Sequence, residues 1–253
     1  MTNPSEQLAI AQVAIYAILV IPSIYILIKH SWQGLNGWIF LFGFCILRII
    51  GCALQISDDK NGTISTIPII ISGVGLSPLV LAFMGILHES NHYIQGRRPF
   101  LLHWPSTLAL HFQVGAAVAL VVVGYTSTSK SGPTLAKVGY ILFVLFFVFI
   151  AALASLSWRY SHTNIDSKRL LISVMVALPF LAIRILYSCI AAFDTSISPF
   201  TGPIAYRVVL AVLMEFICVI IFTVFGAFSR NIRLEQPVVK STRPRINHKS
   251  GDV

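Results

Sequence analysis

Three charged side chains fall inside stretches of the sequence that are otherwise apolar. Arg48, Arg184 and Glu215 each lie in a run of about 20 mostly hydrophobic residues, long enough to cross a bilayer. Ionisable groups are costly inside such runs, so they are candidates for function by default. Two guanidinium groups and one carboxylate leave an excess of one positive charge. That excess favours a ligand with a carboxylate or phosphate group.

The positions of these charges along their helices predict that they meet. At about 1.5 Å per residue, all three lie on the order of 10–13 Å from the same predicted face of the membrane. Gln55 and Tyr187 share helix faces with Arg48 and Arg184, at spacings of seven and three residues. We therefore expect a polar pocket of Arg48, Gln55, Arg184, Tyr187 and Glu215. The alternative is an Arg–Glu pair that only fixes the helix register, with the second arginine satisfied by carbonyl and hydroxyl groups.

The string His88-Glu89-Ser90-Asn91-His92 matches the H-E-x-x-H pattern. On a helix, His88 and His92 share a face and can bind zinc, with Glu89 as general base. A third ligand on the same predicted side would be one of His103, His111, His162 and Asp166. The alternative is a polar helix end with no metal. Because no downstream segment marks the third ligand, we expect no cofactor and keep zinc as the lesser alternative.

The composition defines the elements that must position these residues. Of 253 residues, 56% are hydrophobic and 11% are charged, against about 25% charged in soluble domains. This excludes a disordered chain and, with four cysteines, a disulfide-rich secreted scaffold. It predicts an all-α, polytopic bundle of seven transmembrane helices. The predicted spans are Leu8–Ile28, Trp38–Ile56, Ile67–His88, Thr107–Tyr125, Val138–Trp158, Arg169–Ala191 and Tyr206–Phe228.

The placement of Lys and Arg predicts the orientation of the bundle. Twelve of the 18 lie on one side of the predicted spans and four on the other, with Arg207 at the edge of the poorer side. The richer side should be cytosolic, so the N-terminus is outside or luminal and the C-terminus cytosolic. We predict one transmembrane domain over 1–228 and a basic, disordered cytosolic tail over 229–253. The membrane is the plasma membrane or the endoplasmic reticulum, and the net charge of +9 does not indicate nucleic acid.

Two further residues carry predictions. Asn61 begins the sequon Asn-Gly-Thr in a loop that this orientation places outside, so it is a possible glycosylation site. Pro78 is expected to kink the third span. The last span contains no lysine, which excludes a retinal Schiff base there.

Several short strings resemble, in combination, a known family. They are Leu47–Gly51 with Leu54-Gln55, Gly75–Leu79, Arg184–Tyr187, Pro199–Gly202 and Met214-Glu215. Together they resemble a fungal family of seven-helix membrane proteins classified only as a domain of unknown function. The resemblance implies a seven-helix bundle and a role around a lipophilic secondary metabolite. It supplies no established activity, and H-E-x-x-H is not part of the family's pattern.

The leading prediction is a receptor-like or ligand-binding protein whose polar pocket takes an anionic or amphipathic small molecule. The alternative is an integral-membrane enzyme or accessory protein that acts on a lipophilic metabolite, in the manner of a terpene cyclase. A transporter is less favoured because no inverted repeat is visible. The expected partners are the lipid bilayer and a lipophilic or anionic small molecule.

Overall fold

Helices make up nearly all of the described part of the computed structural model, which confirms the expected all-α class. Six stretches within it are long and apolar enough to cross a membrane, so the chain has the architecture of a multi-pass membrane protein. The described residues are 4–61, 71, 74–92, 94, 104–127, 129–160, 165–194, 196 and 203–229, without the side chains of 31–33, 61 and 104–107.

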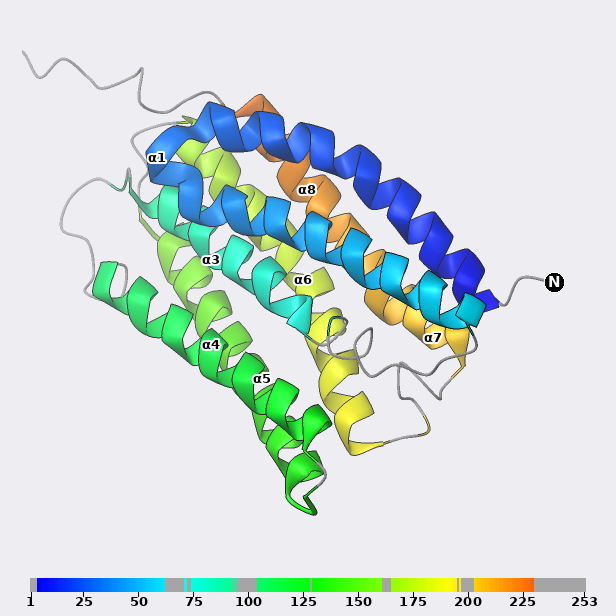
Figure 1. The fold of residues 1–253 in the computed structure, drawn as a ribbon. Coiled ribbons are helices and arrows are strands. Elements are labelled where there is room, and N and C mark those ends of the chain that lie inside the picture. Colours follow the sequence, from blue (N-terminus) through cyan, green and yellow to red (C-terminus); the bar gives the residue numbers. More distant parts are fainter. Residues whose placement is uncertain are drawn as a thin grey trace, which may run out of the picture.

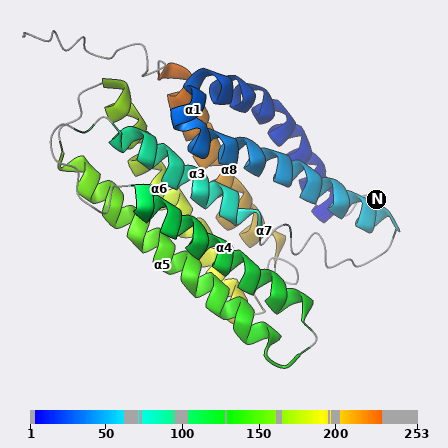
Figure 2. The same ribbon diagram turned by 60° about the vertical axis from the view of Figure 1, so that its left-hand side comes forward.

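The first helix, α1, is a hairpin of two helical arms. It runs over Pro4–Asn61, and a straight helix of its 58 residues would measure about 87 Å. However, the Ser5 hydroxyl donates a hydrogen bond to an Asp59 carboxylate oxygen across 3.2 Å. The helix therefore folds back on itself, as the antiparallel arms in Figures 1 and 2 show. The arms are the apolar stretches Pro4–His30 and Gly34–Lys60.

The sequence predicted a separate loop over Lys29–Gly37, between the first two spans. This prediction is wrong. The backbone stays helical through this segment while it changes direction. The segment contains no proline, so no backbone N–H is missing there to end the helix.

The remaining helices follow the predicted order with shifted boundaries. α4 and α5 lie side by side along one edge of the bundle, and the arms of α1 lie along the opposite edge (Figures 1 and 2). The last predicted span is divided into three segments, of which the middle one is a π-helix, η3. The bounds are α3 Leu76–Asn91, α4 Trp104–Thr126, α5 Gly132–Trp158, α6 Ile165–Phe193, α7 Ile204–Arg207, η3 Val208–Leu213 and α8 Met214–Phe228.

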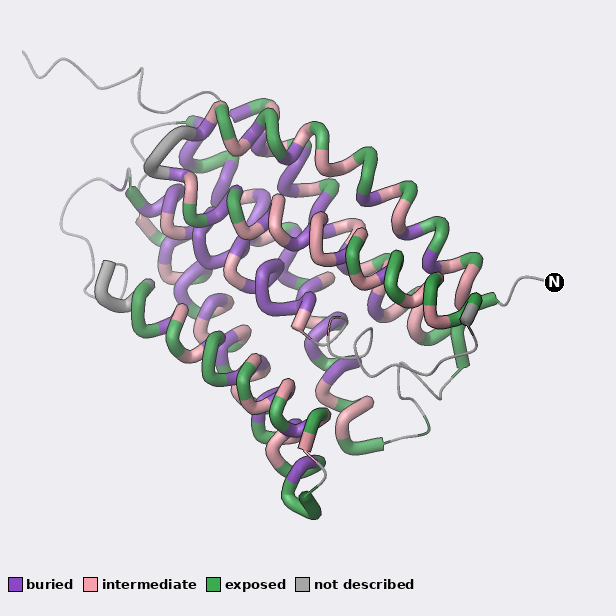
Figure 3. Tube along the Cα trace, in the orientation of Figure 1, coloured by how far each residue is buried: buried purple, intermediate pink, exposed green. Residues whose placement is uncertain are grey.

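α3 is the central helix of the bundle, although as described it is shorter than the helical segments at the other predicted spans. Its 16 residues measure about 24 Å, and it packs against α1, α4, α5 and α6. All but two of its residues are buried (Figure 3). The described helix begins at Leu76 and ends at Asn91, whereas the prediction was Ile67–His88; residues 67–70, 72 and 73 lie outside the described part of the chain.

Glycines permit a close approach between α1 and α3. A Cβ atom added at Gly37 would lie 2.8 Å from the backbone nitrogen of Ile86, and one added at Gly85 would clash with the backbone of Gly37. Small residues let helix backbones approach in this way inside membranes. The contact fixes the second arm of α1 against the central helix.

The outer faces of the helices are apolar. Ile21, Ile28 and Phe112 are each more than 70% exposed, and exposed residues follow the outside of the bundle in Figure 3. A contiguous apolar surface of this kind is unfavourable in water and suits contact with lipid.

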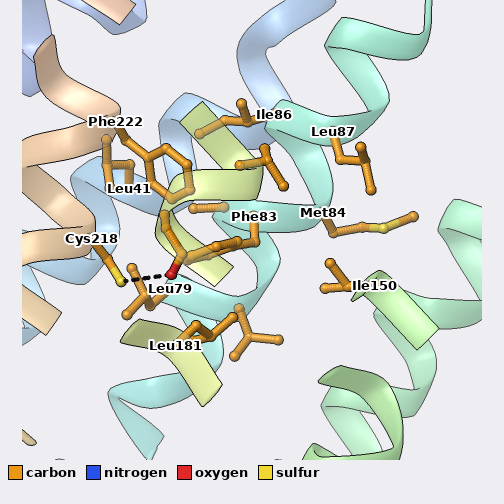
Figure 4. Close-up of a cluster of buried hydrophobic side chains, with 14 of the residues drawn as sticks. Leu41, Leu79, Phe83, Met84, Ile86, Leu87, Ile150, Leu181, Cys218 and Phe222 are labelled. Atoms are coloured by element: carbon orange, nitrogen blue, oxygen red, sulfur yellow. Dashed lines mark hydrogen bonds between the residues drawn. The ribbon is translucent and has the colours of Figure 1, made fainter. Parts of the chain in front are cut away.

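A layer of apolar side chains crosses the middle of the bundle (Figure 4). The rings of Phe83 on α3 and Phe222 on α8 meet edge to face, with centroids 4.6 Å apart. Leu41 and Leu181 pack in the same buried cluster, and the Cys218 thiol donates to the carbonyl of Ala177. This layer separates two buried polar clusters, one towards each end of the bundle.

Candidate functional site

The first polar cluster is centred on Glu215 of α8, which is fully buried. Its Oε1 atom accepts hydrogen bonds from two guanidinium groups, those of Arg48 on α1 and Arg184 on α6; the Arg184 Nε–Oε1 distance is 2.5 Å. The two arginines are only 8% and 4% exposed. Arg184 also donates to Ser188, one turn further along α6. Three predicted spans therefore bring their charged residues to one point, as the helix positions indicated.

These residues line a small cavity, which we call the arginine cavity. It has a volume of about 30 Å³, and Gln55 and Tyr187, the two other residues of the predicted pocket, are part of its wall. A third arginine, Arg207, also lines it and donates to Gln55 Oε1 across 2.7 Å. Among the described residues, the lining is Gln12, Leu47, Arg48, Gly51, Cys52, Gln55, Ile71, Arg184, Tyr187, Arg207, Ala211, Val212 and Glu215.

The cavity holds more positive than negative charge. The described part of its wall carries three guanidinium groups and one carboxylate, an excess of two positive charges. Among the described residues, Arg207 has no carboxylate within ion-pair distance. Within the described residues, the charge of Asp59 acts on Arg207 without an ion pair between them, so the wall keeps a positive excess that favours an incoming anion.

Several buried polar atoms in and beside the cavity have no hydrogen-bond partner among the described residues. They are Glu215 Oε2, Arg48 Nε and the hydroxyl of Tyr16. Buried polar groups in folded proteins are nearly always hydrogen-bonded, and leaving one without a partner costs about 1–3 kcal/mol. Orphaned donors and an orphaned acceptor at one place indicate room for a bound water or ligand.

The π-helix η3 places Arg207 and Glu215 on the same cavity. π-helices are rare and occur frequently at functional sites. η3 lies between these two residues, and its own Ala211 and Val212 form part of the wall. In a regular α-helix, residues eight apart lie about 80° apart around the axis, so sequence periodicity did not assign Arg207 to the face of Glu215. The sequence-based prediction places Arg207 at the edge of its span and does not include it in the predicted pocket, whereas the structure places it in the cavity wall.

The second polar cluster, which we call the Glu89 cluster, contains part of the H-E-x-x-H string. Glu89 is 5% exposed, and both of its carboxylate oxygens are used. Oε1 lies 2.7 Å from Nδ1 of His30, and Oε2 accepts from the Trp38 indole across 2.8 Å. The other ring nitrogen of His30 lies 3.0 Å from the carbonyl oxygen of Gly226 on α8. Glu89 thus joins α3 to the bend of α1.

Ser90 and Asn91, the next two residues of the string, connect α3 to α6 and α5. The carbonyl of Ser90 accepts a hydrogen bond of 2.6 Å from Ser167 on α6, and the Asn91 side chain accepts one from Ser157 on α5. The end of α3 is therefore joined to α1, α5 and α6 by polar contacts, a role that fits the alternative of a polar helix end.

The zinc alternative finds no ligand cluster in the described residues. No group of three or more His, Cys, Asp or Glu side chains in that part of the chain is arranged to hold a metal ion. His88 is half-buried, His92 is exposed at the end of α3, and His111 stacks on Phe40. Asp166 pairs with Arg169, while the other proposed third ligands, His103 and His162, lie outside the described residues.

A family model matches nearly the whole chain. The match covers residues 3–232, and the family is described as a domain of unknown function, DUF7702. The chain belongs to this family. The match confirms the resemblance as far as a family of unknown function is concerned, while the fungal source and the link to secondary metabolites stay predictions. Comparisons of this DUF7702 chain with curated proteins and with solved structures gave no match.

The matched region of the DUF7702 chain includes every residue of the arginine cavity and of the Glu89 cluster.

Pro78, expected to kink a helix, lies in the first turn of α3, where a proline starts a helix without removing an intrahelical hydrogen bond. Asn61 is the last residue of α1, and its side chain lies outside the described structure, so its glycosylation stays a prediction.

Proposed function

We propose that this DUF7702 protein is a receptor-like, ligand-binding membrane protein and that the arginine cavity binds the anionic group of a small molecule. The charge excess of the cavity carries this proposal. A pair of opposite charges that only fixed the helix register would need one arginine for Glu215. Here Arg48 and Arg184 share one carboxylate oxygen, and Arg207 is held by the neutral side chain of Gln55.

The size of the cavity limits what can enter it. A water molecule needs on the order of 10–15 Å³ of such volume, so about 30 Å³ holds two or three water-sized groups. A carboxylate has that size, whereas sites for drug-sized molecules occupy roughly 300–1,000 Å³. The charged group of the ligand therefore enters the cavity and the remainder of the ligand lies outside it.

The contacts of Glu215 favour binding over acid-initiated catalysis, the alternative that the sequence left open. An acid catalyst must carry a proton to give away. Glu215 instead accepts hydrogen bonds from two guanidinium groups through one oxygen, so that oxygen is already engaged within the protein. With the orientation predicted from the Lys and Arg distribution, the Arg207 end of the cavity faces the outside or the lumen.

Thermal unfolding in nanodiscs of neutral lipid tests this proposal with acetate as the probe and acetamide as its uncharged counterpart. We expect acetate, and not acetamide, to raise the melting temperature, since a ligand at 100 times its Kd stabilises the folded state by about 2.7 kcal/mol. Arg207→Gln should abolish the acetate response. Lys137→Gln is the control, because Lys137 lies over the ring of Phe193 and does not line the cavity. Equal responses to acetate and acetamide, or an unchanged response in Arg207→Gln, would contradict the proposal.

A further inference from the structure

An apolar groove lies beside the arginine cavity on the lipid-facing side of the bundle. It has a volume of about 240 Å³ and separates the first arm of α1 from η3 and the start of α8. Leu8, Ala11 and Ile15 form one wall, and Val208, Leu213 and Phe216 form the other. Ala11 and Leu213 are exposed, so the groove reaches the surface that meets the acyl chains.

The groove and the cavity are neighbours that share two wall residues. Gln12 on α1 and Val212 on η3 line both of them. Tyr16 also lines the groove and is 1% exposed, and its hydroxyl has no partner within the part of the chain that the structure describes. A molecule lying in the groove would therefore meet an unused hydroxyl and then the guanidinium groups as it passes inward.

We propose that the ligand is a single-chain anionic amphiphile, a long-chain carboxylate, whose head group lies in the arginine cavity and whose aliphatic chain lies in this groove. This inference rests on the proposed function, because it requires the cavity to bind an anion. The small cavity holds a head group and leaves no room for a chain, whereas the adjoining groove presents almost entirely apolar side chains. The amphiphile would enter sideways from the bilayer, between α1 and η3.

The competing occupant of the groove is an ordinary acyl chain of the bilayer. Such a chain would cover the apolar walls without using the guanidinium groups. It would show no dependence on Arg207, and it would be found equally at other lipid-facing positions, such as Ile18 and Ile21 on the same arm.

A photoreactive hexadecanoate with a mid-chain diazirine distinguishes these cases in nanodiscs of neutral lipid. Mass spectrometry of the labelled chain should place the adducts on the groove walls, and an excess of unlabelled hexadecanoate should reduce them about tenfold. Arg207→Gln should reduce labelling to a similar extent. Ala11→Phe, which fills the groove, should also reduce it, whereas Ala17→Phe should not, because Ala17 is an exposed residue of the same arm that lines neither space.

Two results would overturn this inference. Adducts spread over Ile18, Ile21 and other lipid-facing residues, without competition, would assign the groove to bulk lipid. Labelling that survives Ala11→Phe would show that the chain lies elsewhere. If acetate still stabilises the protein in an Arg207-dependent manner, the cavity binds an anion and only the placement of the chain is wrong. If acetate has no effect and labelling is also unspecific, both proposals fail.

Discussion

Two buried glutamates occupy opposite ends of the same bundle, and their surroundings differ. Glu215 shares one oxygen between two arginines and leaves the other oxygen without a partner. Glu89 uses both oxygens, one towards His30 and one towards Trp38. Along α8, Glu215 and Gly226, the residue that contacts His30, are separated by about 16 Å. The apolar layer of Figure 4 fills that interval.

The packing also differs, because it is tight around Glu89 and leaves a cavity beside Glu215. A Cβ atom added at Gly34 would lie 2.7 Å from Glu89, and one added at Gly226 would clash with the Trp38 ring, so the Glu89 cluster has no spare volume there. Glu215 faces a cavity with a net positive wall. A closed cluster with matched donors and acceptors, such as the Glu89 cluster, stabilises the fold. An open cluster with excess charge, such as the arginine cavity, is suited to binding a ligand. The H-E-x-x-H string belongs to the closed cluster.

The largest expected effect comes from removing the acceptor of the closed cluster. Glu89→Leu leaves the donors of His30 and Trp38 buried without a partner, at a cost of about 1–3 kcal/mol for each. We expect a large fall in the melting temperature in nanodiscs. The control is Glu6→Leu, at a half-buried position in the first turn of α1, which should change the melting temperature little. A Glu89→Leu protein as stable as the wild type would show that the cluster does not hold the fold.

Overpacking the closed cluster should have the next largest effect. Gly226→Ala directs a methyl group at the Trp38 ring, which is 1% exposed and has no space to move into. Overpacking of this kind costs about 1–3 kcal/mol. Gly115→Ala on α4 is the matched control, because a Cβ atom there meets nothing within 4 Å. Equal melting temperatures for the two variants would indicate that the cluster is looser than the structure shows.

A pair of aromatic substitutions compares the two regions directly. Trp38→Phe removes the donor to Glu89 Oε2, so it should lower the free energy of unfolding by about 1–3 kcal/mol. Tyr16→Phe removes a hydroxyl that has no partner among the described residues, so it should not lower the stability of the ligand-free protein. The free energy of unfolding of both variants, measured by chemical denaturation in one detergent, checks the two predictions. A larger loss for Tyr16→Phe than for Trp38→Phe would reverse the assignment of the closed and open regions.

The smallest effect is expected at Asp194, an exposed acid. Like Glu89, Asp194 has two hydrogen-bond contacts. Ser196 donates to Asp194 through its backbone N–H and its hydroxyl, and these bonds lower the pKa of Asp194 below 3.8. Because the folded pKa is the lower one, the associated stability is present above pH 3.8 and is lost as the pH falls through the folded pKa. Ser196→Ala should therefore lower the melting temperature slightly at pH 6. At a pH below the folded pKa of Asp194, it should not change the melting temperature. A melting temperature that differs more at low pH than at pH 6 would contradict this linkage.

The sequence predicted the convergence of Arg48, Arg184 and Glu215 because the rise of a helix is fixed. Their distances along three spans could be compared without knowing how the helices pack. The apolar runs likewise predicted the all-α class and most of the spans. These predictions depend on local geometry and on the cost of polar groups in lipid.

The sequence did not predict features that depend on tertiary packing. The π-helix that directs Arg207 into the cavity has no sequence pattern of its own, and the periodicity of an α-helix pointed elsewhere. The partners of Glu89 could not be predicted either, because His30 and Trp38 meet it only through the bend of α1. A possible signal was present in this case: His30, Trp38 and Glu89 all lie near one predicted membrane face.

The most direct measurement of the central claim is binding of a small carboxylate to the purified full-length protein. Saturation-transfer NMR in nanodiscs of neutral lipid, with butyrate as the probe, reports this contact without a long chain that partitions into the bilayer. We predict a saturable butyrate signal that acetate displaces, that Lys137→Gln retains and that Arg207→Gln loses. A butyrate signal that does not saturate, or that Arg207→Gln retains at full strength, would contradict the account of the arginine cavity.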